Sequence, residues 1–361
     1  METIQAGLEE VEGLDQLDES GWGDYPIDTL LIRTESRTVF DVVRRIDSGG
    51  VVLNPEFQRD FIWPIDVQSK LIESVMMRIP LPVFYLAEDE QGRTIVVDGL
   101  QRLSTFHHFL HGGLRLQLPH QELLHKKKFS DLTPKLQNRV EDCNLVLYII
   151  DAKVPERARL DIFERVNSGI PLTRQQMRNC LYSGPATAFL KQHAKSDAFQ
   201  IATGGSLKSG TMRDREFVNR FCAFKLLDIN DYRGDMDEFL ARALRRMNTM
   251  SQDALAQLGQ SLQTALVNNW ELFGKHSFRK HSPASGDRTV INASLWDVMS
   301  TGLAGVGQNI VVQQIEVIRE RFYELMRDPV FIDAITYSPN STNKVHARFH
   351  LASGLFEGLE N

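Results

Sequence analysis

The chain has 361 residues, of which 42% are hydrophobic and 24% are charged, and its formal net charge is -6. This composition is typical of a globular protein with up to two domains. The acidic balance excludes a basic surface over the whole molecule, so any nucleic-acid contact must be a local patch. The sequence shows neither a signal peptide nor an apolar run of membrane-spanning length, and its three cysteines lack the spacing of a zinc site. We therefore expect a cytoplasmic protein without a membrane segment.

The patterning divides the chain into three segments. Residues 1–26 are acidic and contain glycine, and we expect a flexible leader there. Residues 27–152 alternate short strand and helix patterns, which predicts an α+β domain. Residues 153–361 carry almost only helical periodicity, which predicts a helical domain.

The expected elements of the α+β domain follow from periodicity and from turn residues. Helices are predicted over 39–46, 64–77, 100–110 and 132–141, and strands over 51–53, 83–87, 94–97, 114–118 and 145–150. In the helical domain the predicted helices cover 155–167, 173–182, 185–195, 214–227, 235–247, 251–273, 292–303 and 307–327. The helix from 173 starts with Thr173 and Gln176 in the spacing of a capping box.

One strand runs directly into a helix at Asp98-Gly99, a junction that aims helix amide groups at any ligand above the strand end. Asp98 as N-cap with Gln101 three residues later forms an acidic capping box, which explains both residues without a function. Arg102 is not explained in this way, because a cation in the first turn of a helix is unfavourable by roughly 0.3–1 kcal/mol. An anion that neutralises Arg102 would account for it, which favours a ligand with a phosphate group.

Two further loops carry residues suited to a nucleotide. Gln58 and Arg59 lie near Trp63 in the sequence. In this combination the arginine can bind a phosphate through its charge, and the aromatic ring can stack on a base. The alternative is a surface turn in which Trp63 packs inward. Arg165 and Asn167 lie where a helix is expected to end, and Arg165 either lines a phosphate site or complements the helix C-terminus.

Other charged clusters have ordinary explanations. Lys126, Lys127 and Lys128 form a basic loop, which either solubilises the surface or contacts a DNA backbone. Arg174 and Arg178 either line a phosphate site or complement a helix end. The residues from Arg213 to Glu216, with Arg220 one turn later, predict a solvated, salt-bridged helix face. His107 and His111 share a helix face, but no Glu or Cys accompanies them, so we do not expect a metal site there.

Four motifs occur in a fixed order along the chain. They read Pro55-x-Phe57-Gln58-Arg59-x-x-x-Trp63, then Leu71-Ile72-x-Ser74 with Ile79-Pro80-x-Pro82, then Val97-Asp98-Gly99-x-Gln101-Arg102-Leu103, then Phe163-x-Arg165-Val166-Asn167-x-Gly169-x-Pro171-Leu172. Together they resemble the N-terminal domain of GmrSD-type restriction endonucleases, which is placed with the ParB/sulfiredoxin-like fold. The resemblance covers about residues 35–225.

The resemblance implies a role in bacterial anti-phage defence, in which turnover of a nucleoside triphosphate with Mg²⁺ gates attack on DNA, often modified DNA. By position, Asp98, Gln101 and Arg102 would be catalytic. Asp98 would hold the metal or orient a water, Arg102 and Arg59 would clamp phosphates, and Gln101 would position the nucleophile. The implied nucleotide-binding residues are Gln58, Arg59, Trp63, Gly99, Arg165 and Asn167.

Two departures from the family pattern limit these expectations. Leu100 stands where the family motif has a first Gln, so binding could persist while hydrolysis is slow or absent. Residues 230–361 show no His-x-x-Pro start of a His-Asn-His nuclease domain, so we expect a standalone member whose effector, a nuclease or an ATPase, is another chain. A second copy of this chain is a further candidate partner.

Three classes of function stay open on this basis. The first is a nucleotide-hydrolysing defence component that senses DNA. The second is a nucleotide-binding or DNA-binding module that regulates a partner without turnover. The third is a nuclease in which Asp98, with Glu56 or Asp60, holds the metal.

Overall fold

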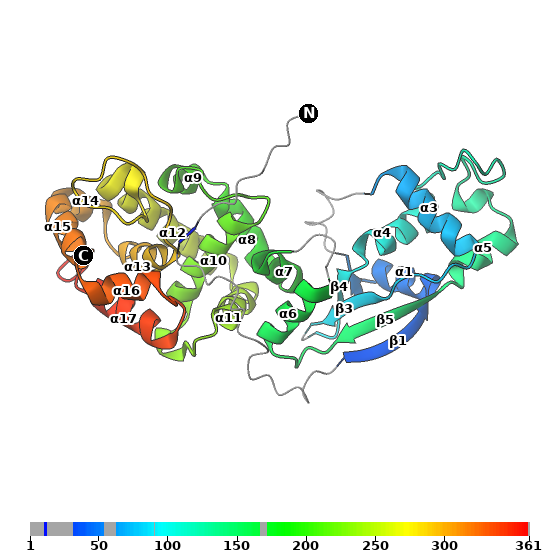
Figure 1. Ribbon diagram of the computed structural model, residues 1–361, viewed down its shortest axis with the longest axis horizontal. Helices are drawn as coiled ribbons and strands as arrows, with labels where there is room; N and C mark the ends of the chain where they lie inside the picture. Colours follow the sequence, from blue (N-terminus) through cyan, green and yellow to red (C-terminus); the bar gives the residue numbers. More distant parts are fainter. Residues whose placement is uncertain (1–10, 13–31, 54–62, 90, 167–171, 360–361) are drawn as a thin grey trace. The chain divides into compact units, whose positions relative to one another are not determined.

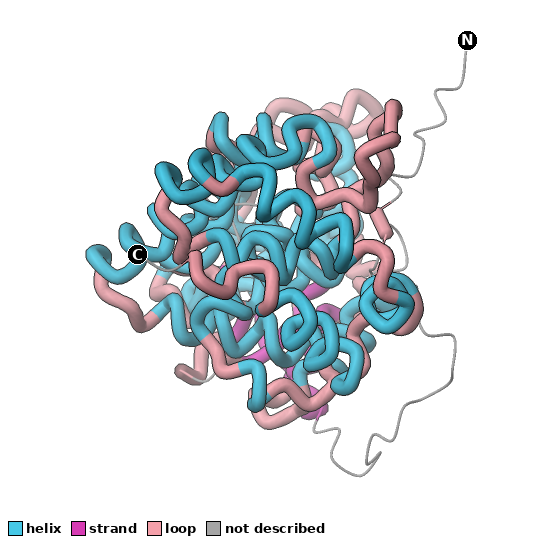
Figure 2. Tube along the Cα trace, turned by 90° about the vertical axis from the view of Figure 1, so that its left-hand side faces the viewer, coloured by secondary structure: helices cyan, strands magenta, loops and turns pink. Residues whose placement is uncertain are grey.

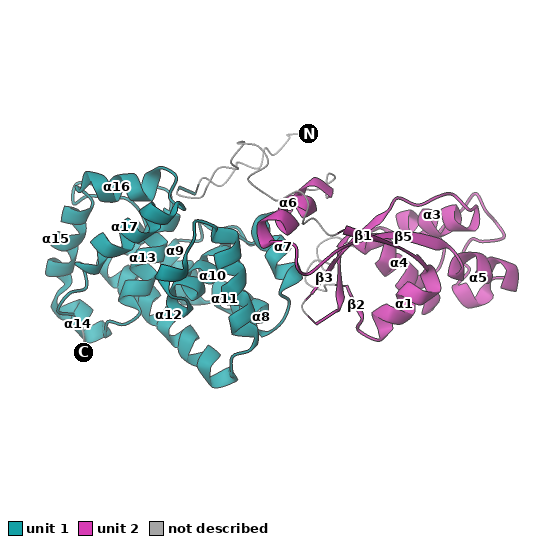
Figure 3. Ribbon diagram, turned by 90° about the horizontal axis from the view of Figure 1, so that it is seen from below, with its two compact units in different colours: residues 1–23, 173–361 teal, residues 24–172 magenta. Residues whose placement is uncertain are grey.

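The computed structural model describes residues 11–12, 32–53, 63–89, 91–166 and 172–359. The chain divides into two compact units, which Figure 3 colours separately: unit 2 consists of residues 24–172, and unit 1 of residues 1–23 and 173–361. Helices account for most of the described chain, and the strands form one small part of it (Figure 2). The prediction of an α+β domain followed by a mostly helical region is thereby confirmed.

Unit 2 contains a five-stranded mixed sheet in the order β1-β5-β3-β4-β2. Figure 1 labels β1, β5, β3 and β4 of this sheet. The pairs β1–β5 and β3–β4 are antiparallel, whereas β3–β5 and β2–β4 are parallel. The strands are β1 (Ile32–Thr38), β2 (Val51–Val52), β3 (Phe84–Glu88), β4 (Thr94–Asp98) and β5 (Asn144–Ile150).

One face of this sheet shares a hydrophobic core with four helices, namely α1 (Val39–Asp47), α3 (Ile65–Met76), α4 (Leu100–Leu110) and α5 (Pro134–Glu141). Side chains alternate along β4, so Val96 packs in this core, whereas Ile95 and Val97 are buried outside it. Helix α6 (Glu156–Val166) contacts β4, and Arg159 donates a hydrogen bond to the carbonyl oxygen of Glu88 at 3.1 Å.

Three features of unit 2 differ from the sequence expectations. Strand β1 was not predicted, because its alternating charged residues leave no apolar period. The strand predicted over 114–118 is absent: its leucines are buried at alternate positions, but its backbone bonds to the turn at Lys126 and Lys127 instead of to a strand. The boundary between the two units in the sequence lies after residue 172 rather than after 152, because α6 contacts β4 of the sheet.

Unit 1 is helical within its described residues, and its core centres on the buried Trp296. The rings of Phe199, Phe217 and Phe278 surround this indole with centroids 4.5–5.6 Å away. The helices are α7 (Arg174–Leu181), α8 (Pro185–Ala194), α9 (Asp197–Thr203), α10 (Arg213–Leu226), α11 (Met236–Asn248), α12 (Gln252–Phe273), α13 (Ala293–Leu303), α14 (Gln308–Gln313), α15 (Ile315–Leu325), α16 (Pro329–Thr336) and α17 (Thr342–Ser353).

The helix predicted over 307–327 is two helices, which meet at Gln314. Helices α9, α16 and α17 were not predicted. Part of the expected leader packs on unit 1, because the backbone of Glu12 bonds to Ile291 and Ala293 and its side chain pairs with Lys280. Among the described residues, no helix has both the length and the apolar character needed to cross a lipid bilayer.

Candidate functional site at the start of α4

Gly99 forms the junction between β4 and α4, and its backbone has a φ of 97°. Residues with a Cβ rarely adopt this left-handed backbone conformation. A Cβ at Gly99 would also lie 2.3 Å from Cδ1 of Phe84 and 3.2 Å from Nη2 of Arg102. Glycine is therefore required here twice, once by the backbone and once by the close packing beneath the turn.

Asp98 and Arg102 form an ion pair across this turn, with Oδ2 and Nη2 separated by 2.8 Å. The Arg102 side chain is only 11% exposed, and it also donates hydrogen bonds to the carbonyl oxygens of Pro82 at 2.5 Å and Val83 at 3.1 Å. Its guanidinium carbon lies 4.2 Å from the centre of the Phe84 ring. Burial lowers the pKa of Arg102, and the charge of Asp98 opposes this effect.

The anion that neutralises Arg102 is therefore a residue of the protein itself. The expectation of an external phosphate at this cation is therefore wrong, because Asp98 supplies the negative charge. The predicted capping box is also wrong. The N-cap of α4 is Gly99, no side chain caps the helix, and the Asp98 carboxylate binds Arg102 instead.

Gln101 connects the start of α4 to the start of α3. Its Oε1 accepts a hydrogen bond from the backbone N–H of Trp63 at 3.0 Å, while Gln68 donates to the carbonyl oxygen of the same Trp63 at 2.6 Å. The two amide side chains thus hold both backbone groups of Trp63. The indole is half-buried and packs against the core of unit 2, as the inward-packing alternative expected.

The structure thus brings Trp63, Asp98, Gly99, Gln101 and Arg102 together at the start of α4. Arg165 is exposed in the last turn of α6. The remaining predicted site residues, Gln58, Arg59 and Asn167, lie outside the described residues, as do Glu56 and Asp60. Sequence reasoning missed Phe84 and Gln68, which support the site from β3 and α3, because neither belongs to a motif around Asp98.

The predicted basic loop is a tight turn on unit 2. Lys126 has a φ of 62°, and its backbone N–H donates to the carbonyl oxygen of Leu116 at 2.7 Å. Leu116 in turn donates to the carbonyl oxygen of Lys127 at 3.0 Å. The side chains of Lys126 and Lys127 are exposed, and Lys128 is half-buried. The turn therefore presents two adjacent cations to solvent.

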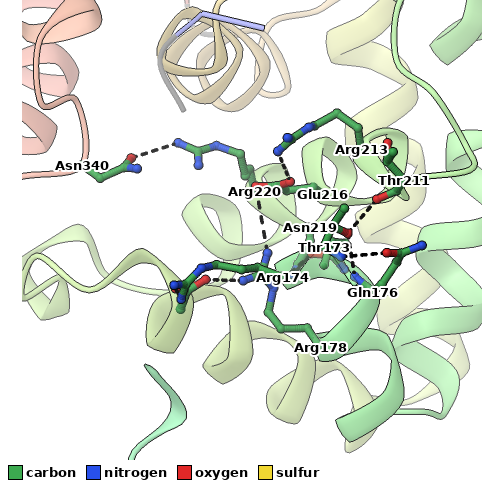
Figure 4. Close-up of polar contacts among 12 residues, drawn as sticks. Thr173, Arg174, Gln176, Arg178, Thr211, Arg213, Glu216, Asn219, Arg220 and Asn340 are labelled. Carbon is green, nitrogen blue, oxygen red and sulfur yellow. Dashed lines mark hydrogen bonds and ion pairs between the residues drawn. The ribbon is translucent and has the colours of Figure 1, made fainter. Parts of the chain in front are cut away.

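Four arginines of α7 and α10, namely Arg174, Arg178, Arg213 and Arg220, bind carboxylates within unit 1, and Figure 4 shows the pair of Arg213 with Glu216. Arg174 and Arg178 each place an Nη1 atom 2.5 Å from the Asp237 carboxylate, and Arg178 is almost fully buried. Arg213 pairs with Glu216 at 2.7 Å. The solvated face predicted for this stretch is wrong for Arg220, which is buried and bound to Asp297.

The fold and the site define an α+β unit with a strand–glycine–helix turn that is closed by an internal ion pair. Residues 39–183 match the family described as the GmrSD restriction endonuclease, N-terminal domain. The match extends from α1 to the residues just after α7 and includes Asp98 to Arg102. This chain therefore carries a GmrSD N-terminal domain over those residues, which confirms the resemblance. No curated protein matches the chain.

Proposed function

We propose that this chain is a component of a bacterial restriction system that acts on DNA and binds a nucleoside triphosphate with Mg²⁺ at the start of α4. The observation that carries the proposal is the family match over residues 39–183, which contains the Asp98–Arg102 turn. The description of the matched family names a restriction endonuclease, which supports a role of this chain in restriction of DNA.

The geometry around Gly99 supports binding of an anion. Helix α4 begins without a side-chain cap, so its first-turn amides and its dipole are suited to a phosphate. Asp98 is 34% exposed, and Arg102 occupies only one of its carboxylate oxygens. The other oxygen can take Mg²⁺, which prefers carboxylate and phosphate ligands.

In this proposal each residue of the turn has a separate role. Asp98 holds the metal, and Arg102 is a positioning residue, because three protein oxygens already fix its guanidinium. Gln58, Arg59, Arg165 and Asn167 complete the proposed nucleotide site, whereas the Trp63 indole packs against the core of unit 2. In this arrangement Arg59, rather than Arg102, clamps the phosphates.

Two observations favour binding with slow or absent hydrolysis, which is the second candidate function. Leu100, at the position of the first Gln of the family motif, packs against the core of unit 2. The Oε1 atom of Gln101 already accepts a hydrogen bond from Trp63, which ties this amide to the start of α3 and leaves a single lone pair of the oxygen for a water. A regulatory module that signals nucleotide binding to a separate nuclease or ATPase chain would fit both observations.

The test uses the full chain with each of the four nucleoside triphosphates and Mg²⁺, with and without unmodified or modified DNA. Nucleotide binding, phosphate release and plasmid nicking are followed together. Asp98→Asn and Arg102→Gln should weaken binding and lower any phosphate release by roughly 100-fold. Arg93→Gln is the matched control, because Asp89 and Arg93 form a pair with the same spacing and the same 2.8 Å distance, but Arg93 is 47% exposed.

Each outcome selects one class of function. Nucleotide binding that is unchanged in Asp98→Asn overturns the proposed site. Leu100→Gln should raise phosphate release if the missing Gln limits hydrolysis. Saturable binding without release, even in Leu100→Gln, identifies the regulatory module. Nicking without any nucleotide identifies a nuclease of the ParB-like domain instead.

A further inference from the structure

Asp47, His107 and His111 form a cluster at the opposite end of α4 from the turn at Gly99. Asp47 is the last residue of α1, His107 lies in the last turn of α4, and His111 is the C-cap of α4. One possible ligand atom from each residue lies within 4.8 Å of the other two. The sequence showed the two histidines on one helix face but no completing ligand, because Asp47 lies 60 residues earlier in the chain.

The spacing of the three groups suits a metal ion. His107 Nε2 lies 3.0 Å from Oδ1 of Asp47, and His111 Nε2 lies 3.4 Å from Oδ2 of the same carboxylate. Two ligands held tetrahedrally at the usual zinc distances are about 3.3 Å apart. The two imidazole rings are stacked with centroids 4.4 Å apart, and the Nε2 atom of each ring contacts the Asp47 carboxylate.

A hydrogen bond at the other ring nitrogen of His111 is compatible with a metal at Nε2. His111 Nδ1 lies 2.8 Å from the carbonyl oxygen of His107, which can only accept, so this nitrogen is the donor. The Nε2 atom faces Oδ2 of Asp47, and either a proton on Nε2 or a metal ion between the two atoms satisfies this contact. Metal-bound histidines commonly have such a second hydrogen bond, because it fixes the tautomer that leaves Nε2 free.

We propose that Asp47, His107 and His111 bind a divalent transition-metal ion of the Zn²⁺ type, with water in the remaining position. Two imidazoles and one carboxylate suit Zn²⁺, Co²⁺ or Ni²⁺ better than Mg²⁺ or Ca²⁺, which prefer oxygen ligands only. The three side chains are 36–49% exposed, so an ion reaches them without opening the core. The ion joins the end of α1 to the end of α4. This proposal does not depend on the proposed function.

The test is a titration of the untagged full chain, first freed of metal with a chelator, with ZnCl₂ and separately with CoCl₂. Calorimetry should give one Zn²⁺ per chain, and bound Co²⁺ should give the visible absorption of a site with nitrogen ligands. Asp47→Asn and His111→Gln should each weaken Zn²⁺ binding about 10-fold or more. His108→Gln, at an exposed position of the same helix, should bind as the wild type does.

Thermal unfolding provides a second readout that also checks folding. Zn²⁺ should raise the midpoint of wild type and His108→Gln but not that of Asp47→Asn, whose midpoint without metal should be close to that of wild type. The proposal is overturned if wild type binds no Zn²⁺ at millimolar concentration. It is equally overturned if Asp47→Asn and His111→Gln keep the wild-type affinity. The same holds if the ion is lost only in His276→Gln or His281→Gln, two residues of unit 1 whose rings stack on each other.

Discussion

Arg220 and Asp297 make two parallel hydrogen bonds in the interior of unit 1, from Nε to Oδ1 at 2.8 Å and from Nη2 to Oδ2 at 2.6 Å. Neither side chain is exposed to solvent. Arg348 donates to the same Oδ2 at 2.7 Å and is equally buried. A single carboxylate on α13 therefore holds two buried cations, one on α10 and one on α17.

Replacing this carboxylate should destabilise unit 1 strongly. Asp297→Asn leaves two buried guanidinium groups without a counter-charge, and we expect a loss of about 3–5 kcal/mol in the free energy of unfolding. Urea unfolding followed by tryptophan fluorescence measures this loss, because Trp296 is the buried neighbour of Asp297. Asp231→Asn is the control: its pair with Arg242 is on the surface, and its removal should cost no more than about 1 kcal/mol. Equal losses in the two variants would contradict the prediction.

Gly99→Ala should be destabilising for two separable reasons. The backbone conformation costs about 1 kcal/mol for a residue with a Cβ, and the close approach to Phe84 adds roughly 1–3 kcal/mol of overpacking. Gly92→Ala isolates the first cost, because Gly92 has a φ of 76° with no atom within 4 Å of the added Cβ. Chemical unfolding of both variants should therefore place Gly99→Ala well below Gly92→Ala in stability. A smaller loss for Gly99→Ala would show that Phe84 moves freely.

Asp41 should make the stability of unit 2 sensitive to acid. Hydrogen bonds from Arg44 and Arg37 lower the pKa of Asp41 from 3.8 to about 2. Because the pKa is lower in the folded state, the stabilisation is present above pH 3.8 and disappears as the pH falls through about 2. After allowance for solvent screening, Asp41→Asn should lose about 1 kcal/mol at pH 7. Unfolding curves at pH 7 and near pH 2 measure the difference in free energy of unfolding between wild type and Asp41→Asn, which should become smaller at pH 2. A difference that does not change with pH would contradict the prediction.

The basic turn should contribute to DNA affinity through phosphate contacts. Replacing Lys126, Lys127 and Lys128 with Gln should weaken binding and reduce the slope of log K against log salt concentration by about 2–3. Fluorescence anisotropy with a labelled duplex over a range of salt concentrations measures this slope. The control replaces Lys70, Lys135 and Lys153, which are exposed on unit 2 but are not adjacent in sequence. If the control variant loses as much DNA affinity as the variant of the basic turn, the loss comes from the change in net charge and not from this turn.

Periodicity in the sequence was sufficient to predict most elements that bury one face. Helices α1 and α4 begin and end close to their predicted limits, because apolar spacing and turn residues are local signals. Features that depend on distant partners were missed. Strand β1, which pairs with β5 over a hundred residues later, was not predicted. Helix α6 was predicted, but its place in the unit that contains the sheet was not, because that place depends on contact with β4.

Two similar sequence patterns show where local reasoning stops. At Thr173 the predicted capping box forms: Thr173 Oγ1 accepts from the Gln176 N–H, and Gln176 Oε1 accepts from the Thr173 N–H. At Asp98 and Gln101 the same spacing gives no capping box, because Arg102 takes the carboxylate and Trp63 takes the amide oxygen.

The sequence by itself thus determined the strand–glycine–helix turn and the family to which residues 39–183 are assigned. Only the tertiary structure decided which partners the side chains of that turn bind. It also brought Asp47 to His107 and His111. The physical reason is that backbone turns depend on neighbouring residues, whereas hydrogen bonds and ion pairs form between whichever groups the fold brings within reach.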